Sequence, residues 1–127
     1  MKEQISSNSA PGAIGPYSQA VRSGDTVFLS GQIPLDPESG VLVGGDIDVQ
    51  TARVMENLRA VLAASGCTFA DVVKTTIYLI DLSHFAAVNA AYGRFFEAPY
   101  PARSTVQVSA LPKGAQVEID VIAVKRP

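Results

Sequence analysis

Two stretches of this sequence repeat apolar residues at the spacing of an amphipathic helix, and strand-like runs lie before, between and after them. In residues 48–65, Met55, Leu58 and Leu62 recur at three- and four-residue steps, while charged residues occupy the opposite side. Residues 83–97 carry a second apolar stripe of the same period. Two such helices can cover only one face of a sheet. The pattern therefore predicts an α+β fold, a mixed β-sheet with two helices packed on one face.

Runs rich in β-branched and aromatic residues mark the expected strands, giving the order β-β-α-β-α-β-β. These strands are predicted at residues 17–22, 26–30, 72–80, 104–109 and 117–124. The turn Ser23-Gly24-Asp25 should join the first two strands as a hairpin. The helix ends should fall at capping and stop residues: Asp46 or Asp48 and Gly66 for the first helix, Ser83 and then Pro99 and Pro101 for the second.

The composition supports one compact domain over residues 1–127. With 47% apolar and 17% charged residues, the chain can bury a core. The net charge is −2 and the ten Lys and Arg residues are scattered, which argues against nucleic-acid binding. One cysteine, Cys67, and one histidine, His84, leave no disulfide and no ordinary metal site. No signal-like or membrane-spanning apolar run occurs, so a cytoplasmic protein without membrane contact is expected.

The last predicted strand has two different faces. Alternation along a strand places side chains on opposite sides of the sheet. One side carries Val117, Ile119, Val121 and Ala123, and the other carries Glu118, Asp120, Ile122 and Val124. The first side suits a helix-covered core. The second mixes carboxylates with apolar residues that a monomer would leave in water, which predicts that a partner subunit covers it.

Arg103 and Glu118 are the strongest candidates for chemistry. Arg103 follows the proline-bounded loop at a strand start, and its guanidinium could hold a small carboxylate with two hydrogen bonds. Equally, it could form a structural ion pair with Asp120 or Glu118. Glu118 interrupts an apolar strand and could orient a water or transfer a proton, or it could simply face solvent.

Five further residues have a functional and a structural reading. Tyr17, after Gly15-Pro16, could donate a hydrogen bond, wall a pocket or pack on a strand. Ser30 and Gly31 end a strand, where a glycine permits close approach of a ligand or merely makes a turn. Asn89 could bind ligand or make a structural bond across a subunit boundary. Thr105 shares a face with Arg103 and could offer its backbone N–H, or be an ordinary strand residue.

Seven segments in register resemble the reactive-intermediate deaminase family (RidA, also called YjgF or L-PSP). They run from Ile14-Gly15-Pro16-Tyr17-Ser18-Gln19-Ala20 through Ser30-Gly31-Gln32-Ile33-Pro34, Gln50-Thr51, Asn57-Leu58, Val73-Lys74-Thr75-Thr76 and Val88-Asn89-Ala90-Ala91-Tyr92 to the signature Pro101-Ala102-Arg103-Ser104 … Val117-Glu118-Ile119. The resemblance covers residues 10–124. The chain departs from it at Thr105, where many deaminase members have cysteine.

The resemblance implies a chorismate-mutase-like homotrimer with sites in the clefts between subunits. It implies a 2-iminobutanoate/2-iminopropanoate deaminase, which hydrolyses 2-aminoacrylate-type enamines and their imines, released by pyridoxal-phosphate enzymes, to 2-keto acids and ammonia. It assigns Arg103 to the substrate carboxylate and Glu118 to the water. Neither metal nor cofactor is required, because the imine is already electrophilic.

Three other functions remain open at this stage. A non-catalytic sensor of small carboxylates could use the same pocket. A related hydrolase could act on another reactive intermediate, and the Thr105 departure keeps that alternative alive. An endoribonuclease is disfavoured by the scattered basic residues and the single histidine. The physiological substrate is not fixed by the sequence.

Overall fold

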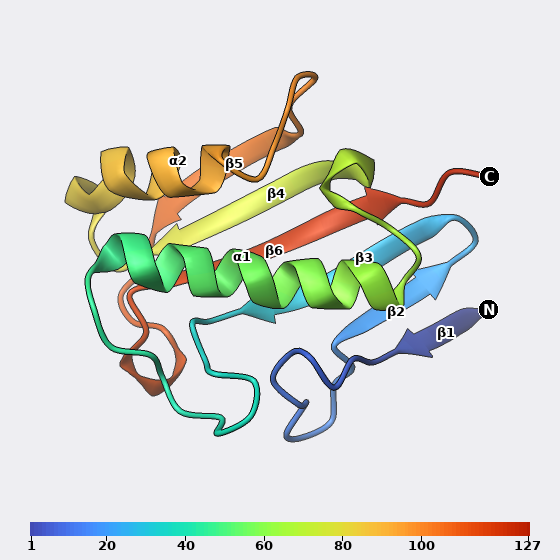
Figure 1. The fold of residues 1–127 in the computed structure, drawn as a ribbon, viewed down its shortest axis with the longest axis horizontal. Helices are drawn as coiled ribbons and strands as arrows, with labels where there is room; N and C mark the ends of the chain where they lie inside the picture. The colour runs from blue at the N-terminus through green and yellow to red at the C-terminus, as the bar shows by residue number, and fades with distance from the viewer.

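The computed structural model describes residues 1–127 as one six-stranded mixed sheet with two helices on the same face (Figure 1). The predicted α+β class is therefore confirmed. The strands and helices are β1 (Lys2–Ile5), β2 (Ala20–Ser23), β3 (Thr26–Gln32), α1 (Ile47–Ala64), β4 (Val72–Leu79), α2 (Phe85–Gly93), β5 (Ala102–Gln107) and β6 (Val117–Val124). The sheet order is β1-β2-β3-β6-β4-β5, and only β4 and β5 pair in parallel.

Helix α1 crosses the middle of the sheet and supplies much of the core. It begins where the Asp46 side chain accepts a hydrogen bond from the Val49 N–H at 3.2 Å. It ends at Ala64 with Ser65 as its C-cap, before Gly66 turns the chain with φ +77°. Met55, Leu58 and other apolar residues of its inner face are completely buried. The predicted first helix is confirmed, with Asp46 as its cap.

Helix α2 is shorter than predicted, and Ser83 does not cap it. A 3₁₀ turn, Leu82–His84, precedes it, and the Asp81 side chain caps that turn by accepting the Ser83 N–H at 2.9 Å. The N-cap residue of α2 itself is His84, which makes no side-chain capping bond. The helix ends at Gly93, well before Pro99. The aromatic residues beyond it still pack inward, because Phe96 is buried and its ring lies 4.7 Å from that of Tyr92.

The N-terminal segment differs from the sequence-based expectation in two ways. Lys2–Ile5 forms the edge strand β1, which was not predicted, and it pairs antiparallel with β2. Residues 17–19 are not in a strand, so β2 begins at Ala20. The predicted hairpin is confirmed, because Ser23 pairs with Thr26 across the two-residue turn. The observed order is therefore β-β-β-α-β-α-β-β.

A β-bulge interrupts β3 beside the middle of β6. Leu29 pairs with Val121 and Gln32 pairs with Ile119, so Ser30 and Gly31 together oppose the single residue between them on β6. A bulge bends its strand and redirects the neighbouring side chains. This irregularity places the Ser30–Gly31 backbone against Glu118.

The two faces of the sheet have the predicted difference. The inward residues of β6 are buried beneath α1, as the alternation predicts. The opposite face has no helix over it and exposes Phe28, Val106 and Val124 between 40% and 44%. Asp120 on this face accepts a hydrogen bond from the Tyr78 hydroxyl at 3.1 Å. Neither helix is long and apolar enough to cross a membrane.

Candidate functional site

Glu118 lies in a pocket formed between β6, the bulge of β3 and the loop before β2. The cavity is about 470 Å³, and its other lining residues include Gly31, Tyr17 and Lys113. Apolar side chains, Ile14 and Ile33 among them, form part of its wall. The carboxylate of Glu118 lies directly over Gly31, where a Cβ would be 3.0 Å from Glu118 Cγ and closer still to the carboxylate. Glycine is required here because any side chain would displace the acid.

The surroundings of Glu118 favour its protonated form. The carboxylate receives no hydrogen bond and forms no ion pair. Burial raises the pKa of Glu118 above its usual value, and repulsion from Asp120 on the same face raises it further. A carboxyl group whose pKa is raised is a stronger base than an ordinary glutamate and is better suited to accept and return a proton.

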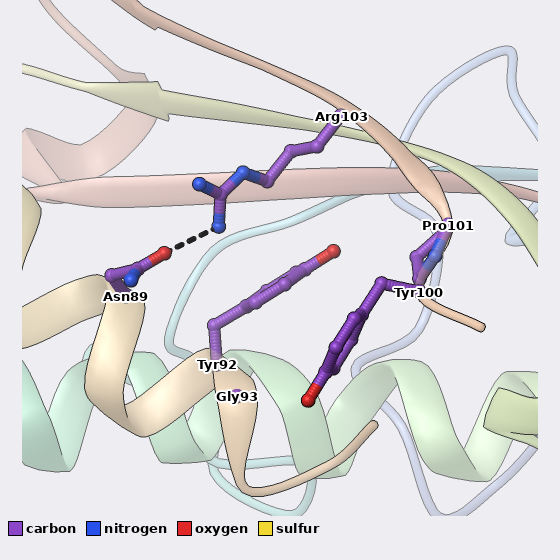
Figure 2. Close-up of a pocket in the computed structure, with 6 residues that line it drawn as sticks. All are labelled: Asn89, Tyr92, Gly93, Tyr100, Pro101 and Arg103. Carbon is purple, nitrogen blue, oxygen red and sulfur yellow. Dashed lines mark hydrogen bonds between the residues drawn. The ribbon is translucent and has the colours of Figure 1, made fainter. Parts of the chain in front are cut away.

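Arg103 lies in a second cavity of about 500 Å³, between α2 and the start of β5. Figure 2 shows its side chain extending from β5 toward α2, where Nη1 donates to Asn89 Oδ1 at 2.6 Å. The guanidinium carbon lies 5.2 Å from the centre of the Tyr92 ring and 5.5 Å from that of Phe85. Arg103 makes no ion pair with Asp120, Glu118 or any other carboxylate. Within one chain, the guanidinium therefore has no carboxylate partner, and its role as a substrate clamp stays a prediction.

Thr105 lies on the same face as Arg103, as predicted. Arg103 pairs with Thr75 and Thr105 with Ile77 in the parallel β4–β5 ladder, and both partners are buried beneath the helices. Thr105 Oγ1 is buried without a hydrogen-bond partner. An unpaired buried hydroxyl carries a desolvation cost and is available to a ligand.

The two cavities lie on opposite faces of the sheet, so one chain does not bring Arg103 and Glu118 together. Arg103 pairs with Thr75, which pairs with Val121, and Val121 is on the helix-covered face. Glu118 lies on the uncovered face, three residues from Val121 and two strands from β5. Strand spacing and rise place the two Cα atoms about 14 Å apart. Each chain therefore carries two half-sites: the Arg103 half-site and the Glu118 half-site.

The remaining candidates divide between these half-sites. Tyr17 lines the Glu118 half-site and leaves its hydroxyl without a hydrogen bond, with 53% of the residue exposed. Ser30 donates its hydroxyl proton to the Ser18 carbonyl oxygen at 2.6 Å, so its proton is held by the backbone. Asn89 lines the Arg103 half-site and orients the guanidinium. His84 lines neither half-site; it is half-buried, with Nδ1 buried and unpaired.

Sequence reasoning missed two residues of the site. Lys113 borders the Glu118 half-site from a left-handed backbone conformation (φ +58°), and its Nζ donates to the Gly40 carbonyl oxygen at 3.3 Å. The preceding Pro112 and following Gly114 signal a turn there but not its position in space. Tyr92 belongs to the apolar stripe of residues 83–97 and is buried, and its ring also supports Arg103. No group of His, Cys, Asp and Glu side chains is arranged to hold a metal ion.

Comparison with known proteins identifies the family of this chain. The family model described as endoribonuclease L-PSP matches residues 7–125. The chain belongs to the RidA/YjgF/L-PSP family. The resemblance inferred from the seven sequence segments is therefore confirmed.

Individual members of the family are similar over nearly their whole length. Protein DfrA of Myxococcus xanthus is 61% identical, over 97% of this chain and 95% of its own. The human 2-iminobutanoate/2-iminopropanoate deaminase is 46% identical, over 100% of this chain and 93% of its own. The crystal structure of E. coli TdcF with bound serine is 43% identical, with a TM-score of 0.93 over 98% of this chain and 99% of that one. The RidA/YjgF/L-PSP family thus includes proteins named as imine deaminases and one that binds a small amino acid.

Proposed function

We propose that this protein is an imine/enamine deaminase that hydrolyses 2-iminobutanoate and 2-iminopropanoate to 2-keto acids and ammonia. The observation that carries the proposal is the pair of half-sites. One offers a guanidinium with no carboxylate partner, and the other offers a carboxyl group with a raised pKa above a glycine. A 2-imino acid needs both, a cation for its carboxylate and a proton-transfer group at C2.

The complete site is proposed to form between subunits of a homotrimer. The two half-sites lie on opposite faces of one chain, so they can meet only if the Arg103 half-site of one subunit packs against the Glu118 half-site of a neighbour. Such a head-to-tail contact closes into a ring of three when each subunit is rotated by a third of a turn from the last. The uncovered sheet face, with its exposed Phe28, Val106 and Val124, supplies apolar surface for that contact.

Arg103 binds and orients the substrate in this mechanism. Its Nη1 bond to Asn89 and the rings of Phe85 and Tyr92 hold the guanidinium in place before substrate arrives. The remaining N–H groups can donate two parallel hydrogen bonds to the substrate carboxylate. The Thr105 backbone lies on the same face and can add a further donor. Binding the carboxylate from this side presents C2 to the neighbouring Glu118.

Glu118 transfers the proton during hydrolysis. As the carboxylate, it accepts a proton from water while the water oxygen forms a bond to C2 and the C=N π electrons move to nitrogen. The protonated Glu118 then gives that proton to the nitrogen of the carbinolamine. Glu118 then moves the hydroxyl proton of the carbinolamine to the same nitrogen. The C2–N bond breaks as the hydroxyl oxygen forms the C=O bond, and ammonia leaves. General acid–base catalysis of this kind contributes roughly 10²–10⁴-fold.

A coupled assay tests the proposal. A threonine or serine dehydratase generates the enamine in situ, and formation of the 2-keto acid is followed with and without the protein. We expect the protein to accelerate keto-acid formation at constant dehydratase activity. If a stable keto acid or serine binds saturably but no acceleration occurs, the protein is a carboxylate-binding module instead. Acceleration with a different imine alone would identify a related hydrolase.

A further inference from the structure

Gln19 is a buried glutamine whose side chain makes four hydrogen bonds to one segment of backbone. Its Oε1 accepts the Ser7 N–H at 2.6 Å. Its Nε2 is within hydrogen-bond distance of three carbonyl oxygens, those of Pro11 at 2.7 Å, Ser7 at 3.2 Å and Ala10 at 3.5 Å. Only 4% of Gln19 is exposed. A buried amide that is fully paired fixes the groups that it bonds.

The segment that Gln19 holds is a wall of the Glu118 half-site. Residues 6–19 contain no helix or strand, so their backbone groups have no ladder to satisfy them. Within this segment, Pro11, Gly12, Ile14 and Tyr17 line the cavity that contains Glu118. Without the Gln19 amide, nothing in the hydrogen-bond pattern would tie Ser7 through Pro11 to the sheet.

Gln19 is also attached to the bulge beneath Glu118. Its own carbonyl oxygen accepts the Ser30 N–H at 2.9 Å, and the Ser30 hydroxyl donates to the adjacent Ser18 carbonyl oxygen. Ser30 precedes Gly31, over which the Glu118 carboxylate lies. One residue therefore links the wall of the cavity to its floor.

We propose that Gln19 is a positioning residue for the Glu118 half-site: it holds residues 7–17 against the bulge and so shields the Glu118 carboxylate from bulk solvent. This inference rests on the proposed function only for its effect on turnover. The loop placement and the titration of Glu118 can be measured whether or not the protein hydrolyses imines.

The titratable groups around Glu118 determine how its pKa should change when the loop that Gln19 holds becomes loose. Asp120 on β6 and Tyr78 on β4, which donates a hydrogen bond to it, belong to the sheet. Lys113 borders the cavity from the 3₁₀ turn Pro112–Gly114, so none of these groups lies on the loop that Gln19 holds. Burial is the largest cause of the raised pKa of Glu118, and the loop contributes to that burial. Opening the loop should therefore lower the pKa of Glu118 toward its ordinary value and leave the repulsion from Asp120 in place.

The test replaces Gln19 by Met, a side chain of similar length that makes no such bonds. A ¹³C titration of the Glu118 carboxyl group should give a lower pKa in Gln19→Met than in the wild type. Chymotrypsin should cleave after Tyr17 at least tenfold faster, and the acid limb of the pH profile of kcat/KM should move to lower pH. We expect kcat to fall about tenfold or more with a smaller change in KM.

Gln50 provides a matched control. It is also 4% exposed, but its side chain makes one bond of 3.3 Å to the Gly45 carbonyl oxygen and its Oε1 has no partner. Gln50→Met should leave both the Glu118 titration and the Tyr17 cleavage unchanged. If Gln19→Met does not fold, Gln19→Asn keeps a neutral amide that is one methylene group too short to make all four bonds, and the same shifts are expected.

The inference is overturned if either folded Gln19 variant keeps the wild-type pKa of Glu118 and the wild-type cleavage rate after Tyr17, even if its melting temperature falls. Gln19 would then be a structural residue without influence on the site. Absence of imine hydrolysis in the wild type would instead contradict the proposed function and leave these two measurements to decide the role of Gln19.

Discussion

The carboxylate of Glu118 occupies the space where any residue other than glycine at position 31 would place its Cβ. That Cβ would lie 2.8 Å from Glu118 Cδ and nearer still to one carboxylate oxygen. The backbone of Gly31 is not in the left-handed region, so alanine fits the chain conformation itself. The conflict is only between the added methyl group and the carboxylate.

Gly31→Ala should therefore remove activity without unfolding the protein. The methyl group forces Glu118 out of its position, and a displacement of about 1 Å in a reacting group can cost on the order of 100-fold in rate. The measurements are kcat/KM and the melting temperature. Gly44→Ala is the control, because a Cβ at Gly44 meets nothing within 4 Å. Full activity in Gly31→Ala would mean that the position of Glu118 is unimportant for the reaction.

Arg103→Ala and Arg103→Lys should both lose at least 100-fold in kcat/KM. The alanine variant lacks the cation, and the lysine variant cannot present the planar fork that binds a carboxylate with two bonds. Stability should change by less than about 1 kcal/mol, because Arg103 is exposed and leaves no core cavity.

Arg59 supplies the matched control for Arg103. It is also exposed and its guanidinium also lies over two aromatic rings, those of Phe69 and Phe95, but in neither half-site. Arg59→Lys should retain wild-type turnover. If Arg103→Lys is as active as Arg59→Lys, a positive charge alone is enough for the reaction.

The pH dependence of turnover should follow the raised pKa of Glu118. The reaction needs the carboxylate, so kcat/KM should fall as pH drops through a pKa above the ordinary glutamate value. Glu118→Gln should lose most turnover at every pH and still bind a stable keto acid, as measured by calorimetry. An acid limb at or below the ordinary value would assign the proton transfer to another group.

The raised pKa of Glu118 also determines whether ionisation of this residue stabilises or destabilises the folded protein. A carboxyl group whose pKa is raised on folding binds its proton more tightly in the folded state, so its ionisation destabilises the fold as pH rises from the unfolded pKa to the folded pKa. Glu118→Gln should therefore melt at a higher temperature than the wild type at pH 7. Below the unfolded pKa the difference should disappear, because both side chains are then neutral.

The sequence predicts the helices and the inner strands better than the site, and the reason is physical. Helix α1 and strand β6 have strong apolar periodicity because each buries one face. Strand β1 has none, because Lys2, Glu3 and Gln4 are exposed at the sheet edge and only backbone pairing makes it a strand. Alternation within β5 and β6 shows which residues of each strand share a face. It does not give the position of Arg103 relative to Glu118, because that position depends on how β5 and β6 each pair with β4 between them.

Thr105 should contribute through its backbone rather than its hydroxyl. Thr105→Val keeps the shape and removes a buried hydroxyl that has no partner, so stability should stay the same or rise. We expect kcat/KM of Thr105→Val, Thr105→Ser and Thr105→Cys within about tenfold of the wild type, or ~1.4 kcal/mol in barrier. A larger loss in Thr105→Val alone would show that the hydroxyl binds substrate. A gain of orders of magnitude in Thr105→Cys would favour a different physiological substrate.

Mixed assemblies of two inactive variants should recover activity if the site is shared between subunits. Arg103→Ala retains the Glu118 half-site, and Glu118→Gln retains the Arg103 half-site. In a randomly mixed ring, a contact joins the two intact halves with a probability of one half times one half, so about a quarter of wild-type activity is expected. Each variant alone should remain inactive, and a double variant mixed with wild type serves as the control for subunit exchange.

Recovery requires contact between neighbouring subunits, because within one chain Arg103 and Glu118 lie on opposite faces of the sheet. No recovery in assemblies shown by mass spectrometry to be mixed would place both residues' functions within one subunit, and a light-scattering mass of a monomer would remove the shared site altogether.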